Sequence, residues 1–361
     1  MKKLLLLSAA SSIHTVKWVN ALSEFYEVHL AYCSNHAPTI HKVNDNVVLH
    51  ELKYKTKLGY YLNCRQLRKI YKEVKPDYIN VHYASGYGTL ARMAKLPNIV
   101  LNVWGSDVYD FPNQSKIKRN ILKKNIFYAS KLASTSNVMA EEVYKQFPDL
   151  DKKIAITPFG VDTKKFIKKN IKKSKEFIIG NIKALSSKYG IKDIILGVAD
   201  FIKRLKEEKK DYKNVKCHIY GDGESRDEYQ ELINSLNLND TIILKGRIPN
   251  TEVPDVLNQF DVFCAASIVN SESFGVAIVE AMSCEVPVIA TKIDGFSEVM
   301  VDQKTGLMIE KEDYKAISDA LEYMYNNKDK RIEFGKNGRK RVLDNYDWYK
   351  NVKMLVDVLE K

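Results

Sequence analysis

The sequence predicts a two-domain α/β protein in which each domain is a parallel sheet, doubly wound by helices on both faces. Short runs rich in Val, Ile, Leu and Tyr alternate with longer helical patterns in both halves of the chain. A polar, lysine-rich stretch that is unsuited to a core separates the two halves. The 361 residues exceed one average domain, and a hydrophobic content of 45% is enough for two cores.

The apolar runs predict the strands of each sheet in order. In the first half they lie at residues 4–7, 28–33, 78–82 and 99–104. In the second half they lie at residues 177–182, 216–220, 241–244, 262–266 and 286–290. The first run superficially resembles a signal peptide, but it ends at Ala10 and favours a buried strand that feeds a loop. No apolar run in the sequence is long enough to cross a bilayer.

We expect an N-terminal domain over residues 1–163, a linker over 164–176 and a C-terminal domain over 177–335. A helical segment over 336–361 can pack back on the first domain. The linker is marked by seven lysines, namely Lys164, Lys165, Lys168, Lys169, Lys172, Lys173 and Lys175. Open parallel sheets bind ligands beyond the carboxyl ends of their strands. The candidate loops are therefore residues 8–14, 104–107 and 182–188, and we expect the site in a cleft between the domains.

The charge of the chain favours an anionic ligand or surface. The formal net charge is +12 and the pI is about 9.1. Two amphipathic helical patterns concentrate basic residues, which are Arg65, Arg68, Lys69, Lys72, Lys116, Lys118, Arg119, Lys123 and Lys124. These helices can contact an anionic membrane or present a solvated face. Nucleic acid is not an expected partner, because no binding motif or aromatic stacking platform accompanies the charge.

The cysteines and acidic pairs do not predict a metal site. The five cysteines are scattered and odd in number, which is typical of reduced thiols in a cytosolic protein. The sequence Asp149-Leu150-Asp151 lies in a polar turn, remote from the other candidate residues. We therefore expect no metal cofactor.

The segment at residues 271–291 holds two glutamates, Glu272 and Glu280, among small and apolar side chains. Within one helix, eight residues at about 1.5 Å each would separate their backbones by roughly 12 Å. Paired carboxyl groups of glycosidases lie only about 5 to 9.5 Å apart, so this spacing better suits two points on one extended ligand. A helix is expected to begin at Gly275, where free amides can hold a diphosphate. The alternative is that Glu272 stabilises the helix dipole and Glu280 lies on a solvated face.

Five motifs in order along the chain make it similar to the family-four glycosyltransferases of the GT-B fold. They are Gly221-Asp222-Gly223, Gly246-Arg247-Ile248, residues 272–280, residues 295–298 and Thr305-Gly306. The resemblance covers nearly the whole chain. It implies two Rossmann-like domains that face across a cleft. It also implies a nucleotide sugar bound mainly by the C-terminal domain, an acceptor bound by the N-terminal domain, and metal-independent transfer with retained anomeric configuration.

The same resemblance implies a donor site, whose residues are Lys183, Lys188, Arg247, Ile248, Glu272, Ser273, Phe274, Gly275, Val276 and Glu280. Lys183 and Lys188 would neutralise the leaving diphosphate, because a fixed cation stabilises charge that grows in the transition state. Many relatives carry arginine in place of Lys183, and lysine supplies a point charge instead of a fork. Two ordinary surface lysines are the alternative. Glu280 would bind the ribose, Glu272 a sugar hydroxyl, and the backbone at Ile248 the base.

The acceptor site implied by the resemblance consists of Ser11, Ser12, His14, Trp104 and Asp107. At Ala9-Ala10-Ser11-Ser12, small residues replace a glycine pair that is common in the family, and they still permit close approach of a phosphate or sugar. Many relatives have histidine where this chain has Trp104. Asp107 is expected in the active site, with helix capping as its alternative, and His14 touches the acceptor or is structural. The catalytic candidates are Asp107, Lys183, Lys188 and Glu272.

The hypothesis is a cytosolic retaining glycosyltransferase, at the inner face of the cell membrane if it binds lipid. Its donor is a nucleoside-diphosphate sugar, expected to be UDP-linked, and its acceptor is a glycan or lipid-linked molecule in surface polysaccharide synthesis. One alternative is a transferase of the same fold with a soluble small-molecule acceptor. Another is a non-catalytic nucleotide-sugar-binding protein. A dinucleotide-dependent oxidoreductase is disfavoured because no glycine fingerprint follows the first strand.

Overall fold

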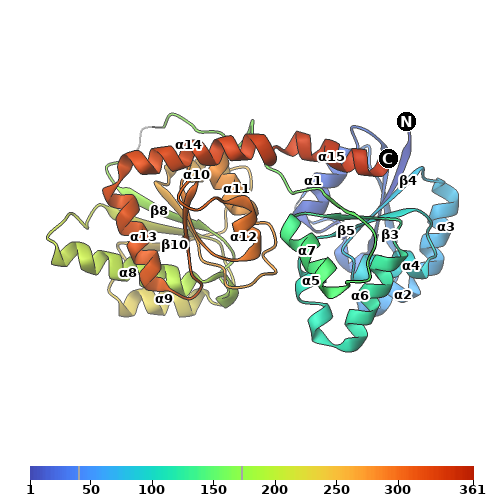
Figure 1. Ribbon diagram of the computed structural model, residues 1–361, viewed down its shortest axis with the longest axis horizontal. Coiled ribbons are helices and arrows are strands. Elements are labelled where there is room, and N and C mark those ends of the chain that lie inside the picture. Colours follow the sequence, from blue (N-terminus) through green and yellow to red (C-terminus); the bar gives the residue numbers. More distant parts are fainter. Residues whose placement is uncertain (40, 172–173) are drawn as a thin grey trace. The chain divides into compact units, whose positions relative to one another are not determined.

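The computed structural model describes residues 1–39, 41–171 and 174–361, which form two compact units (Figure 1). Unit 1 comprises Met1–Pro158 and Tyr349–Lys361, and unit 2 comprises Phe159–Trp348. Each unit contains one parallel β-sheet with helices on both faces. The predicted class, two doubly wound α/β domains, is therefore confirmed.

The sheet of unit 1 has the strand order β3-β2-β1-β4-β5-β6-β7. Its strands are β1 (Lys3–Leu7), β2 (Glu27–Cys33), β3 (Val48–Leu52), β4 (Tyr78–His82), β5 (Ile99–Val103), β6 (Lys131–Ser134) and β7 (Ile154–Ile156). Central strands such as β5 are buried on both faces, as expected where helices cover both sides of a parallel sheet. The strand order reverses between β1 and β4. The loops that follow these two strands thus lie where open sheets bind ligands.

The helices of unit 1 come from both ends of the chain. They are α1 (Ile13–Leu22), α2 (Thr56–Leu62), α3 (Cys64–Val74), α4 (Gly86–Met93), α5 (Ser106–Tyr109), α6 (Lys116–Tyr128), α7 (Asn137–Gln146) and most of α15 (Trp348–Glu360). Helix α15 buries Val352, Leu355 and Leu359. The hydroxyl of Tyr26 donates a hydrogen bond to Glu360 Oε1 at 3.2 Å, which ties α15 to the start of the chain.

The sheet of unit 2 has the order β10-β9-β8-β11-β12-β13 and reverses between β8 and β11. Its strands are β8 (Phe177–Ile182), β9 (Val215–Tyr220), β10 (Ile242–Gly246), β11 (Val262–Ala265), β12 (Val288–Thr291) and β13 (Gly306–Ile309). Its helices are α8 (Ile191–Glu207), α9 (Arg226–Ser235), α10 (Val253–Gln259), α11 (Val276–Ser283), α12 (Asp294–Val299), α13 (Tyr314–Asn326) and α14 (Lys328–Asn345). Helix α13 packs along α8, and α14 packs along α11 (Figure 1).

The path of the chain between the units differs in detail from the expected boundaries. Residues 159–163, expected in the first domain, belong to unit 2. Part of the expected linker also lies on unit 2, because the amide of Lys169 donates to Asn258 Oδ1 at 2.7 Å. The linker residues Lys172 and Lys173 lie outside the described residues. The helical segment 336–361 is divided, with the end of α14 in unit 2 and nearly all of α15 in unit 1.

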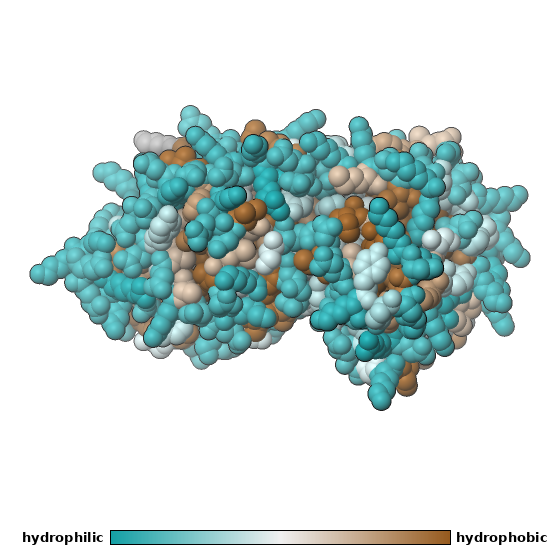
Figure 2. Space-filling view, in the orientation of Figure 1, coloured by the Kyte–Doolittle hydropathy of each residue, from teal (hydrophilic) through white to brown (hydrophobic). Residues whose placement is uncertain are grey.

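The hydrophilic surface and the free cysteines agree with what the composition of the sequence predicts. Hydrophilic side chains cover most of the face shown in Figure 2, with apolar side chains interspersed. All five cysteines are free. Within the described residues, no helix combines the length and apolar character that a membrane crossing requires.

Candidate functional site

Two of the donor-site residues predicted in unit 2, Lys183 and Glu272, meet where the strand order reverses. Lys183 directly follows β8, and Glu272 lies in the loop between the neighbouring strand β11 and helix α11. The ammonium of Lys183 forms an ion pair with Glu272 Oε2, and the two side chains are 27% and 20% exposed. The hydroxyl of Ser267 donates to the same oxygen at 3.5 Å. Two of the expected catalytic residues are therefore in direct contact.

Tyr189 holds the two candidate lysines beside each other. The centroid of its ring lies 4.3 Å from Lys183 Nζ and 5.0 Å from Lys188 Nζ. The negative face of an aromatic ring attracts an ammonium group, so one ring stabilises both lysines. The backbone carbonyl of Lys188 also accepts a hydrogen bond from the amide of Ile268 at 3.0 Å, which joins the β8 and β11 loops. The ring of Tyr189 thus contacts both lysines, and one of them, Lys183, is also paired with Glu272.

Helix α11 supplies a second source of positive potential. It spans Val276–Ser283, which confirms the predicted helix and its start. Gly275 precedes it with φ 72° and ψ 51°, a left-handed conformation that favours glycine, and offers no side chain to cap the first turn. Amide donors and the positive end of the helix dipole favour anions at such a terminus. Glu280 is the fifth residue of α11 and is only 9% exposed, so it does not occupy a solvated face.

Helix α12 and two aromatic rings fix the loop that carries Glu272. A Cβ atom on Gly295 would lie 2.1 Å from the carbonyl oxygen of Glu272 and 2.6 Å from the amide nitrogen of Phe274. Only glycine therefore lets α12 approach this loop so closely. The ring of Phe274 packs edge-on against Phe159 and Tyr346, with centroids 5.8 and 5.4 Å apart. Gly295, the first residue of the predicted motif at residues 295–298, thus packs against the backbone of the Glu272 loop and supports it.

The remaining donor candidates are on the same unit, in a different loop. Arg247 is exposed and Ile248 is half-buried, and both follow the edge strand β10. Strand β9 separates β10 from β8, and the amide of Gly221 donates to the carbonyl of Gly246 at 2.8 Å. Ser273 is buried beside Phe274. The structure thus brings Lys183, Lys188 and Glu272 together and places Arg247 and Ile248 two strands away from the Lys183 strand.

Asp107 of unit 1 is buried and bonded to backbone amides. It is 1% exposed, and its carboxylate accepts hydrogen bonds from Ala84 at 2.8 Å, Trp104 at 3.1 Å and Gly105 at 2.9 Å. Burial raises the pKa of Asp107, while these amide donors act in the opposite direction. The donors belong to the loops that follow β4 and β5. The geometry therefore gives Asp107 a positioning role that joins two loops.

Trp104 covers a buried histidine. Its ring lies 4.3 Å from the ring of His82, 5.1 Å from Tyr83 and 6.3 Å from His14, measured between centroids. His82 is fully buried, and burial lowers its pKa to about 3. Its imidazole is therefore neutral near pH 7. The Nδ1 atom of His82 has no hydrogen-bond partner within the described part of the chain.

A cavity of about 1060 Å³ opens in unit 1 beside the loops that follow β1 and β4. Ser11 and Ser12 line it, whereas the other acceptor candidates do not belong to its described lining. Its aromatic wall, which no motif in the sequence predicts, consists of Tyr60, Tyr61, Tyr83, Tyr87 and Phe111. A signal was present, because Tyr83 directly follows a predicted strand at a position where ligands bind open sheets.

Several of the other charged candidates have structural partners. Asp149 of the Asp-x-Asp sequence pairs with Lys123 at 2.7 Å. The guanidinium of Arg68 donates to the carbonyl of Ala94 at 3.0 Å, just beyond α4. Among the described residues, no group of three or more His, Cys, Asp or Glu side chains is arranged to hold a metal ion.

Two family models match the chain, glycosyl transferases group 1 over residues 162–341 and glycosyl transferase 4-like over residues 3–136. An uncharacterised glycosyltransferase of Methanocaldococcus jannaschii is 24% identical over 97% of this chain and 94% of its own length. The capsular polysaccharide biosynthesis glycosyltransferase CapM of Staphylococcus aureus is 26% identical over 83% of this chain and 82% of its own. The crystal structure of HepE from Anabaena in complex with UDP shares the fold, with a TM-score of 0.79, 17% identity and 99% coverage of both chains.

Proposed function

We propose, from the premise that this chain belongs to the group 1 glycosyl transferases and has the GT-B fold, that it transfers a sugar from a UDP-sugar with retained anomeric configuration. Its proposed acceptor is a glycan or lipid-linked molecule in surface polysaccharide synthesis. The contact of Lys183 with Glu272, beside the start of α11, is the observation that carries the proposal. UDP is favoured because HepE was solved with it, and a polysaccharide product because CapM acts in capsule biosynthesis.

In this proposal the diphosphate of the donor lies over the first turn of α11. The amides there, together with Lys183 and Lys188, would offset its negative charge. Glu280 would accept hydrogen bonds from the ribose hydroxyls, and Glu272 would bind a hydroxyl of the sugar. The rigid backing of the Glu272 loop by Gly295 supports this role, since a positioning carboxylate must be held within a fraction of an ångström.

In the proposed mechanism, no covalent intermediate forms between the sugar and the protein. The bond between the anomeric carbon and the departing phosphate oxygen breaks while the acceptor hydroxyl attacks from the same face. The acceptor proton passes to the departing phosphate. Lys183 and Lys188 stabilise the charge that develops on that group, which lowers the barrier more than it strengthens ground-state binding. Because these lysines and the α11 amides supply positive charge, we propose that no metal is required.

The cavity of unit 1 is the proposed acceptor site. Leu58 lines the cavity and is 66% exposed, and Leu62 and Ile117, which are sequence neighbours of the lining residues Tyr61 and Lys118, are 53% and 73% exposed. Leu58 and the neighbouring Lys57 line the cavity itself. Apolar and basic side chains in one patch favour an anionic bilayer surface. This combination supports a lipid-linked acceptor and peripheral contact at the inner face of the cell membrane.

The first experiment is a donor screen with the full chain. Each nucleotide sugar is tested by thermal shift and by release of free nucleotide, with and without EDTA. A UDP-sugar should raise the melting temperature by mass action and release UDP slowly, and EDTA should change neither result. Stabilisation by a different nucleotide would overturn the choice of UDP, and loss of turnover in EDTA would overturn metal independence.

The second experiment tests the residues. Lys188→Ala and Glu272→Ala should each lower turnover by about 10² to 10³ with little change in melting temperature. Glu310→Ala, which removes an exposed carboxylate paired with Lys292 in the same unit, is the matched control and should retain activity. Near-normal transfer by both active-site variants would exclude the proposed assignment.

A further inference from the structure

The cavity of unit 1 has a distinctive charge pattern. Two lysines, Lys57 and Lys118, stand among its lining residues, and no carboxylate lines it within the described part of the chain. The ammonium of Lys118 donates to Gln114 Oε1 and lies 5.7 Å from the ring centroid of Phe111. Both partners also line the cavity, so Lys118 is held at its wall. The charge of this cavity is complementary to an anion.

Two helices begin at the cavity wall and add to this potential. Helix α1 starts after Ser12 and α4 starts after Ser85, and both serines line the cavity. Neither serine side chain caps its helix, and neither first turn contains an acidic residue. The positive ends of two backbone dipoles therefore reinforce the two lysines.

The rest of the wall suits a sugar ring. The ring of Tyr60 lies over the backbone of Gly86, where a Cβ atom would come within 2.4 Å of it, and meets Tyr87 edge-on at 5.4 Å. Burial raises the pKa of Tyr60 and of Tyr83 to about 12, so both hydroxyls stay protonated and neutral. Aromatic faces pack on the apolar face of a sugar, and neutral hydroxyls bond to its oxygens.

Two residues with a strained backbone conformation line the same cavity. Thr56 has φ 69° and Tyr83 has φ 66°, and both residues line the cavity. A positive φ is costly for residues other than glycine, and especially so for a β-branched threonine. Such strain is retained where the surrounding structure requires a particular geometry, which is common at binding sites.

We propose that this cavity binds a sugar that carries an anionic group, with the ring on the tyrosine wall and the anion beside Lys57 and Lys118. The inference rests on the proposed function, since it defines the chemical class of the acceptor as an acidic or phosphorylated sugar. A sugar attached to a lipid through phosphate and a soluble sugar phosphate share this chemistry.

The test uses the full chain saturated with UDP, which blocks the donor site, and measures binding by calorimetry. The probes are glucose 1-phosphate, methyl α-glucoside and inorganic phosphate. Glucose 1-phosphate should bind at least tenfold more tightly than either of the others. Vesicles that carry a lipid-linked sugar phosphate, compared with vesicles of the lipid phosphate alone, then distinguish the lipid source from the soluble one.

Paired variants separate the two halves of the site. The double variant Lys57→Met with Lys118→Met should abolish the preference for glucose 1-phosphate and leave methyl α-glucoside and UDP affinities unchanged. Lys124→Met removes an exposed charge from the same helix, α6, and should change nothing. Tyr61→Ser should weaken the binding of glucose 1-phosphate and of methyl α-glucoside, and leave the binding of inorganic phosphate unchanged.

Equal affinity for glucose 1-phosphate and methyl α-glucoside would overturn the inference. So would a loss of the preference for glucose 1-phosphate in Lys124→Met as large as the loss in the double variant. The proposed function fails separately, if UDP does not bind or no nucleotide sugar is turned over. In that case a preference for glucose 1-phosphate, measured without UDP, would still identify the cavity as a binding site.

Discussion

Lys183 is paired with Glu272, so a diphosphate that approaches this lysine competes with a carboxylate of the protein. The pair is partly exposed, and such pairs contribute about 1 kcal/mol at most. A nucleotide sugar can replace the contact with two others, since its diphosphate binds the lysine and its sugar hydroxyl binds the glutamate. UDP has no sugar, so it can supply the contact with the lysine but not the contact with the glutamate.

We therefore predict that Glu272→Gln binds UDP about fivefold more tightly than the original chain, while transfer falls by two orders of magnitude or more. The reason is that the substitution removes the internal competitor of the diphosphate and also the group that positions the sugar. Calorimetry with UDP and a turnover assay measure the two effects. Glu310→Gln is the control, and weaker UDP binding by Glu272→Gln would contradict the competition.

His82 makes unit 1 sensitive to acid. Its pKa is lowered to about 3 by burial, against an ordinary value of 6.5. The unfolded chain therefore binds this proton more readily, so the stabilisation is complete above pH 6.5 and is lost as the pH falls toward 3. We predict that unit 1 loses stability over this range and that His82→Gln flattens the dependence. Unfolding midpoints measured between pH 7 and 4 test this, and an unchanged slope in the variant would contradict it.

Individual residues were predictable where a local motif carries them. Lys183 directly follows a strand that the apolar runs predict, and Glu272 lies in the loop after the neighbouring strand, so their meeting follows from the sheet order. The role of Asp107 was less accessible, because one of its three amide partners, Ala84, is 23 residues away in the chain. The aromatic wall was missed because Tyr60 comes from a different helix from Tyr87.

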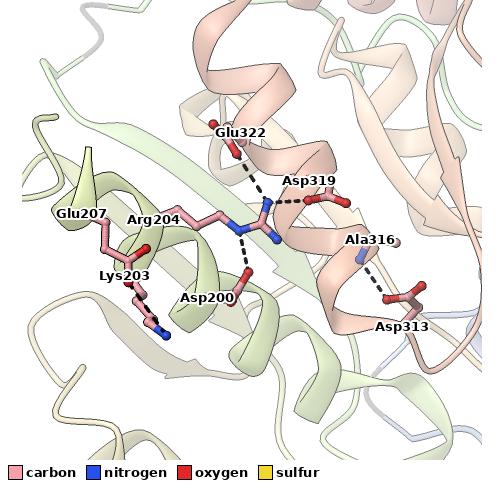
Figure 3. Close-up of polar contacts among 8 residues, drawn as sticks. All are labelled: Asp200, Lys203, Arg204, Glu207, Asp313, Ala316, Asp319 and Glu322. Atoms are coloured by element: carbon pink, nitrogen blue, oxygen red, sulfur yellow. Dashed lines mark hydrogen bonds and ion pairs between the residues drawn. The ribbon is translucent and has the colours of Figure 1, made fainter. Parts of the chain in front are cut away.

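At the scale of elements, an arginine joins two helices of unit 2 that pack against each other, α8 and α13 (Figure 3). Arg204 of α8 pairs with Asp200 Oδ2 at 2.8 Å on its own helix. It also reaches α13, where it contacts Asp319 and lies 3.5 Å from Glu322 Oε2. The hydrogen bond to Asp319 is the main reason that the pKa of Arg204 is raised. A network with several partners is better placed to stabilise a helix pair than an isolated pair is.

We predict that Arg204→Met destabilises unit 2 by about 1 kcal/mol, because it separates α8 from two acidic partners on α13. Lys203→Met, at the preceding residue, removes only an exposed ion pair with Glu207 at 3.9 Å and should have no measurable effect on stability. Hydrogen exchange of the α8 and α13 amides reports the change. Equal protection in the two variants would show that the network does not hold the helices together.

Strands were predictable according to their burial. The nine predicted strands are present within a few residues of their expected limits, because each is rich in apolar residues, although some, such as β9 with Lys216 and His218, also contain polar ones. Four were missed, namely β3, β6, β7 and β13. Strand β3 (Val48–Leu52) is an edge strand with mostly exposed residues, and β7 (Ile154–Ile156) has only three residues. Neighbouring strands hold such elements in place, and that support is not visible in a local pattern.

At the scale of the whole molecule, the chain leaves unit 1 at Pro158 and returns to it at Tyr349. The returning helix α15 buries one face and exposes the other. Leu355 is 1% exposed, whereas its neighbour Met354 is 43% exposed. The stability of unit 1 therefore depends on residues far from the rest of it in sequence.

We predict that Leu355→Ala destabilises unit 1 by about 3 kcal/mol through the cavity it leaves, and does not destabilise unit 2. Met354→Ala is the matched control and should be close to neutral. Hydrogen exchange resolves the two units, with the amides of β1 and β2 reporting on unit 1 and those of β8 and β9 on unit 2. Loss of protection in unit 2 alone would contradict the assignment of α15.

The split of unit 1 between the two ends of the chain also sets an order of assembly during synthesis. Unit 2 is continuous from Phe159 to Trp348 and has all of its residues before α15 has been made. Unit 1 is begun first and finished last. Until residues 349–361 emerge from the ribosome, the hydroxyl of Tyr26 and the ammonium of Lys131 lack the α15 groups that they bind in the finished fold. The N-terminal part of unit 1 is therefore made before unit 2, but it can complete its fold only after residues 349–361 have been made.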